Sequence, residues 1–121
     1  MKLIINEVKE IISRIKIYFS IQKAHKELDN AIILAEEMYK AHNKRFYVLP
    51  DMQHKLRVFS WSQIKQMRAQ GIFSGRAKEP DFILESFYYT PSRLDQMYMK
   101  PDTKEKKRKA WIEYYKAYRL E

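Results

Sequence analysis

The chain has 121 residues, of which 45% are hydrophobic and 32% are charged, and it contains no cysteine. This length predicts one domain with one core, the composition excludes a disordered chain, and the lack of cysteine excludes disulfides and thiolate zinc sites. With only two glycines and four prolines, the sequence favours long helices over a turn-rich β fold.

The net charge of +9 is concentrated in the middle of the chain. Residues 43–79 carry eight Lys or Arg against two Asp or Glu, a net of +6, whereas residues 1–42 carry seven against six, a net of +1. A basic surface attracts nucleic acid or an acidic protein. The charge distribution alone does not choose between these two partners.

Residues 1–42 contain no glycine or proline and predict helix. Apolar residues recur at helical spacing in the first half, widened by Ile12 and Tyr18, and a second stripe follows from Leu28 to Tyr39. The residues of the first stripe that we expect to dock to a partner are Ile4, Val8, Ile11, Ile15 and Phe19.

A single helix over residues 3–42 would be about 60 Å long, whereas a domain of this size has a radius of gyration of only about 14 Å. The helix therefore either breaks between Ser20 and Asn30 to form a helical hairpin, or projects from the domain. A projecting helix with a wide apolar stripe needs a partner to cover it.

The following elements predict a small basic module. Residues 45–49 and 56–59 favour β structure and predict a two-stranded hairpin. Ser60 begins a short helix that Gly71 ends, with Gln63 completing a capping box. Pro80 suits the first turn of a second short helix.

The last predicted helix begins near Asp102, with Glu105 as its capping-box partner. Its aromatic stripe from Trp111 to Tyr118 favours core packing over base stacking. The basic run at residues 104–109 is either a polybasic patch or the solvated first turns of this helix.

Together these elements predict a mainly α protein with a small β-hairpin, in the α+β class. We expect one folding unit with two parts: residues 1–42 as an N-terminal helical docking segment, and residues 43–121 as a compact basic hairpin–helix module with a C-terminal helix.

The sequence shows no catalytic, cofactor-binding or metal-binding pattern. His25 and Asp29 have the i, i+4 spacing of paired metal ligands, but a third ligand is lacking and exposed helix polar groups are favoured. Residues 74–76 (Ser-Gly-Arg) favour a turn over an anion site. We expect no enzyme activity, no cofactor and no small-molecule substrate.

The basic module predicts a surface that contacts an acidic partner or the phosphates of nucleic acid. Any nucleic-acid binding would be non-specific, because no recognition-helix pattern is present. The residues expected to make these contacts are Arg45, Lys55, Arg57, Lys65, Arg68, Arg76 and Lys78.

Residues 44–91 contain the pieces Lys-Arg-Phe-Tyr-Val-Leu-Pro, Leu-Arg-Val-Phe-Ser, Ile-Lys-Gln-Met-Arg and Phe-Tyr-Tyr-Thr-Pro in this order. In this stretch the chain resembles small basic uncharacterised proteins of gut-bacterial phages and mobile elements. The resemblance implies a virion component, an assembly accessory or a host-directed binder, and it brings no functional residues with it.

We therefore expect a structural or interaction protein within a hetero-assembly such as a phage virion. The alternative is a nucleic-acid-binding accessory protein that acts alone. The sequence lacks the continuous apolar region of a signal peptide, so we expect the host cytoplasm or a virion as its location. Glu7 and Glu10 lie among the lysines of the first helix and argue against membrane binding.

Overall fold

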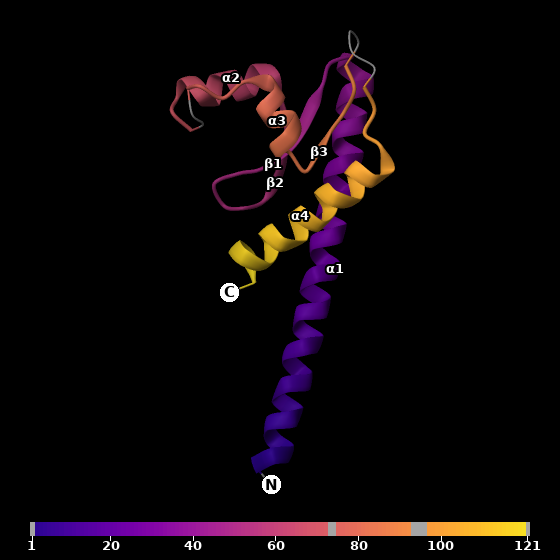
Figure 1. The fold of residues 1–121 in the computed structure, drawn as a ribbon, viewed down its shortest axis with the longest axis vertical. Coiled ribbons are helices and arrows are strands. Elements are labelled where there is room, and N and C mark those ends of the chain that lie inside the picture. The colour runs from indigo at the N-terminus through magenta and orange to yellow at the C-terminus, as the bar shows by residue number, and fades with distance from the viewer. Residues whose placement is uncertain (1, 73–74, 93–96, 121) are drawn as a thin grey trace.

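The computed structural model of the chain describes residues 2–72, 75–92 and 97–120, with side chains from Ile5 onward. This part of the chain forms four helices and one three-stranded antiparallel sheet (Figure 1). The predicted mainly helical α+β class is confirmed.

Helix α1 (Lys2–His42) is one unbroken helix of 41 residues, so of the two predicted arrangements the chain adopts the single helix. The rest of the chain gathers around the half of α1 that leads into the sheet, and the N-terminal half extends away from it (Figure 1). We call the rest of the molecule, without this projecting part of α1, the body. The absence of glycine and proline from residues 2–42 leaves no local reason for a break.

The sheet has the strand order β2-β1-β3. Strands β1 (Phe46–Pro50) and β2 (Leu56–Ser60) form the predicted hairpin, each within one residue of its expected start. Strand β3 (Tyr88–Tyr89) was not predicted and pairs with the other edge of β1. Because β1 is central, its residues 46–49 are all buried, which agrees with their continuous apolar character.

The short helices begin as predicted. At the start of α2 (Trp61–Ala69) the backbone N–H of Gln63 donates to the Ser60 hydroxyl (3.3 Å), and the Ser60 N–H donates to the Gln63 side chain (2.8 Å). Gly71 follows the helix with a φ of 80°, a left-handed conformation that favours glycine. Helix α3 (Glu79–Glu85) has Pro80 in its first turn.

Helix α4 (Pro101–Arg119) begins one residue before its predicted start. Proline fits the first helical position because its φ is already helical and its missing N–H needs no partner there. Asp102 is therefore inside the first turn, and Lys100 is the N-cap, without a side-chain cap. The predicted capping box between Asp102 and Glu105 is wrong.

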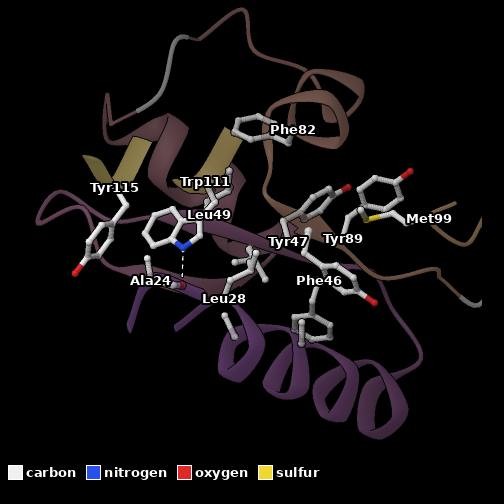
Figure 2. Close-up of a cluster of buried hydrophobic side chains, with 14 of the residues drawn as sticks. Ala24, Leu28, Phe46, Tyr47, Leu49, Phe82, Tyr89, Met99, Trp111 and Tyr115 are labelled. Atoms are coloured by element: carbon white, nitrogen blue, oxygen red, sulfur yellow. Dashed lines mark hydrogen bonds between the residues drawn. The ribbon is translucent and has the colours of Figure 1, made fainter. Parts of the chain in front are cut away.

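The core lies where α4 crosses α1 and the sheet (Figure 2). Trp111 is fully buried, and its indole N–H donates to the carbonyl of Ala24 on α1 (2.8 Å). Tyr115 is buried beside it, whereas Tyr118 at the end of the same stripe is exposed. Core packing of the aromatic stripe is thus confirmed for Trp111 and Tyr115, and Tyr114 is partly buried against the core.

Candidate interaction surface

The N-terminal half of α1 carries apolar side chains that the body does not cover. Between Ile5 and Phe19, the large apolar side chains are exposed to between 46% and 59%. Of the predicted docking residues, Val8, Ile11, Ile15 and Phe19 are among them, and the side chain of Ile4 lies outside the described residues. We define the apolar stripe as Ile5, Val8, Ile11, Ile12, Ile15, Tyr18 and Phe19.

The apolar stripe points away from the body. The α1 residues that pack into the core are Ala24, Leu28, Ala31 and Ala35. At about 100° per residue, their mean direction lies about 180° around the helix from that of the stripe. The helix therefore has two apolar faces in succession, and only the second one is covered by its own chain.

The second half of the predicted docking segment belongs to the core. Ala24 and Ala35 are fully buried, so residues 24–35 of α1 form part of the body. The part of α1 that projects is the part before Ile21, which packs against the core, and it is shorter than the predicted segment of residues 1–42.

Arg45 is buried and does not lie on a basic surface. Its side chain is 7% exposed, its Nε donates to the carbonyl oxygen of Thr90 (2.8 Å), and its guanidinium lies 5.7 Å from the centre of the Tyr89 ring. The Glu79 carboxylate lies 4.0 Å from Nη1 of Arg45. The prediction that Arg45 contacts a partner at the surface is therefore wrong, because the β1–β3 pairing encloses it.

Two other predicted contact residues are held by the body. The Arg57 guanidinium lies 2.6 Å from the Asp51 carboxylate at the hairpin turn, which lowers the pKa of Asp51. Arg68 on α2 donates to the Ala77 carbonyl (2.7 Å) and lies over the Trp61 ring. Arg57 is nonetheless exposed, whereas Arg68 is partly buried. The other four predicted contact residues are exposed: Lys55, Lys65, Arg76 and Lys78.

The basic run at residues 104–109 helps to attach α4 to the body. The Lys107 ammonium donates to three carbonyl oxygens at the end of α3, those of Ile83 (2.8 Å), Leu84 (3.0 Å) and Ser86 (2.6 Å). Burial lowers the pKa of Lys107, and Glu85 opposes this effect. Sequence reasoning missed this role, since the three acceptors are distant in the chain.

The paired His25 and Asp29 are bridged by Arg108. The guanidinium donates to the Asp29 carboxylate and lies 3.2 Å from Nδ1 of His25. A cation from α4 thus occupies the place between the two side chains. Within residues 2–72, 75–92 and 97–120, no three His, Cys, Asp or Glu side chains are grouped to hold a metal ion. Of the predicted turn at residues 74–76, Ser74 lies outside the described residues.

A groove of about 500 Å³ lies between α3 and α4. Its lining is mostly apolar, with Ile83, Phe87 and Ala110 among its walls, and it includes the charged residues Glu85, Lys106 and Lys107. The Lys107 ammonium is already engaged by three carbonyl oxygens.

Two buried tyrosines donate to carboxylates on other elements. The Tyr47 hydroxyl donates to Glu79 (2.6 Å), and the Tyr88 hydroxyl donates to Glu36 on α1. Burial, followed by the neighbouring carboxylate, raises the pKa of each phenol well above its ordinary value. Both pairs tie the sheet to helices and need the protonated phenol.

These pKa shifts predict a loss of stability at high pH. Because the folded-state pKa of Tyr47 and Tyr88 exceeds the unfolded value, their contribution is complete below about pH 10 and is lost as the pH rises above it. Urea unfolding at about pH 8 and about pH 11 should show a smaller drop in the double variant Tyr47→Phe/Tyr88→Phe than in the wild type. Equal drops in the two proteins would contradict this assignment.

Comparisons of the chain with protein-family models, with curated proteins and with solved structures found no match. Among the described helices, none combines the length and the apolar character that crossing a bilayer requires. The geometry of the apolar stripe and of the basic module is therefore the basis for any statement about function.

Proposed function

We propose that this protein is a non-enzymatic interaction protein, a small component or accessory of a larger assembly, and that it docks to another protein chain through the apolar stripe. The observation that carries this proposal is the exposure of the stripe, between 46% and 59% for each side chain. The resemblance of residues 44–91 supports a phage virion as the assembly.

The size of the stripe supports docking. Seven large side chains, each about half exposed, leave on the order of 700 Å² of apolar surface in water, given that a side chain of this kind has on the order of 200 Å². The largest apolar patch of an ordinary monomer is roughly 300–600 Å². A contiguous stripe above this range is typical of a surface that a partner covers.

The exposed cations of the basic module support a second contact. Lys55, Lys65 and Lys78 are exposed on a chain with a net charge of +9, and they suit an acidic protein surface or phosphates. They also support the alternative, a nucleic-acid-binding protein that acts alone. Binding to random duplex DNA that weakens steeply with salt would favour this alternative, and no binding at low salt would end it.

The docking proposal predicts that one charge on the stripe abolishes assembly. Ile12→Glu places a carboxylate within the stripe. The control Ser13→Glu places the same charge one residue later, on the outer face of the helix. When tagged chains are purified from the cells in which the protein is native, wild type and Ser13→Glu should retain a stoichiometric protein partner, which can be a second copy, and Ile12→Glu should lose it. If the same proteins co-purify with all three tagged chains in the same amounts, the proposal that the protein docks through the stripe is wrong.

A further inference from the structure

The apolar stripe follows a heptad repeat. Val8 and Ile15 occupy position a, and Ile11 and Tyr18 occupy position d, with the alternating spacing of three and four residues that a helix pair requires. The remaining members, Ile5, Ile12 and Phe19, all occupy position e. The stripe is therefore wider on the e side than on the g side.

The g side and most of the outer face are polar, and the exception among the described side chains is Ile17 at position c, which is 47% exposed. Glu7 and Arg14 occupy position g, Lys9 and Lys16 occupy position b, and Ser13 lies at position f. All five side chains are exposed. A helix with apolar a, d and e positions and charged g positions has one defined face for packing against another helix.

We infer that the occupant of the apolar stripe is the same stripe of a second copy of this chain, paired antiparallel about a two-fold axis. This inference rests on the proposed function and names its partner. Two-fold pairing is the commonest way in which a self-complementary surface is covered.

The asymmetry between e and g favours the antiparallel direction. In a parallel pair, g side chains lie against e side chains of the second helix, so Glu7 would contact Ile12 and Arg14 would contact Phe19. In an antiparallel pair, e lies against e and g against g. The apolar e residues then cover one another, and the charged g residues stay together at the wet edge.

One register pairs every member of the stripe with another member. In this register, a residue of one copy shares a core layer with the residue of the second copy whose number brings the sum of the two to 26. Ile11 therefore packs against Ile15 of the second copy, and Val8 packs against Tyr18 of the second copy. At the e positions, Ile12 meets its own symmetry mate and Ile5 meets Phe19. Arg14 lies near its mate, and the Glu10 carboxylate, 2.7 Å from the Arg14 guanidinium, offsets the like charges.

The area and the placement of the body suit this pairing. About 700 Å² of apolar surface from each copy is close to the ~800 Å² per partner of a standard interface. Since the core-facing residues of α1 lie about 180° from the stripe, each body stands on the outer side of the helix pair. The two bodies therefore do not compete with the second helix for the stripe.

The mass of the purified chain tests the pairing. By light scattering after size exclusion, wild type and Ser13→Glu should have twice the 14.8 kDa chain mass, and Ile12→Glu, which would bring two carboxylates together at the axis, should have the monomer mass with an affinity at least about a hundredfold weaker. Both substituted residues, Ile12 and Ser13, are solvent-exposed in the single chain, so circular dichroism should show the body folded in each protein.

Spin labels test the direction. The chain has no native cysteine, so Asn6→Cys and Ser13→Cys each place one label per copy. In the antiparallel register the two copies of residue 13 lie at the same level on opposite outer sides of the helix pair. Residue 6 instead lies level with residue 20 of the second copy, so its two copies are also about 20 Å apart along the axis, at about 1.5 Å per residue. The distance between the two labels should therefore be longer at residue 6 than at residue 13, whereas a parallel pair would give equal distances at the two positions.

The outcomes separate this inference from the proposed function. A dimer with the longer separation at residue 6 supports it, and a dimer with equal separations at the two positions overturns the antiparallel pairing. A monomeric wild type overturns the second copy as the occupant. If the monomer binds the dye ANS strongly and Ile12→Glu removes this binding, the proposed function stands with a different protein partner. If the monomer instead binds to vesicles of anionic lipid, the occupant of the stripe is a membrane surface.

Discussion

Replacing Trp111 with alanine should lower the free energy of unfolding by about 3–5 kcal/mol, the largest loss expected from one substitution in this chain. Trp111 is fully buried where α4 crosses α1, and its ring packs against Phe87 and Tyr115. The alanine would leave a cavity between α1, α4 and Phe87 and would leave the Ala24 carbonyl without its donor. Urea denaturation followed by circular dichroism measures the effect.

A loss of this size can unfold a marginal domain, so a second variant is needed. Trp111→Phe keeps a ring in the core but removes the donor to Ala24, and it should cost about 1–3 kcal/mol. Tyr118→Ala, on the same helix but 57% exposed, should cost at most about 1 kcal/mol. Equal losses in Trp111→Ala and Tyr118→Ala would contradict the described core.

Replacing Arg45 with methionine should lower the free energy of unfolding by about 2–3 kcal/mol. Methionine keeps the apolar stem but leaves the buried Thr90 carbonyl without the Arg45 donor and the Glu79 carboxylate without its cation. Glu79 is 42% exposed, so most of the loss comes from the hydrogen bond to Thr90.

Arg57→Met is the matched control, since it removes an arginine from the neighbouring strand. Arg57 is 62% exposed and pairs with Asp51 at the hairpin turn, so its loss should cost at most about 1 kcal/mol. A smaller loss for Arg45→Met than for Arg57→Met would mean that Arg45 lies on the surface, as the sequence had predicted.

The elements that local signals specify were predicted well. The Ser60–Gln63 capping box, the stop at Gly71 and the helix start at Pro80 each depend on residues within a few positions of one another, and all three are present. The hairpin was predicted for the same reason. Its strands differ from their expected bounds by one residue.

The features that sequence reasoning missed depend on distant partners. Strand β3 has only two residues, and it is a strand because β1 pairs with it from about forty positions away in the chain. Arg45 is buried because Thr90 and Glu79 surround it. The one available signal was its place directly before the continuous apolar run of residues 46–49, which is typical of a central strand.

The candidate surface was predicted in part. The length of the first helix and the spacing of Val8, Ile11, Ile15 and Phe19 indicated a projecting apolar stripe, and these side chains are exposed. The basic patch was predicted from composition, which does not show that Arg57 and Arg68 have partners within the body. Charge totals report how many cations are present, whereas their availability depends on tertiary contacts.

Hydrogen exchange of the α1 backbone measures most directly whether another molecule covers the projecting helix. A bare helical segment exchanges quickly because it frays without packing. We expect the amides of residues 5–19 to exchange slowly in concentrated protein, and to exchange quickly on dilution and in Ile12→Glu. Equally fast exchange of these amides in dilute, concentrated and native-cell preparations would show that no partner covers them and would contradict the account.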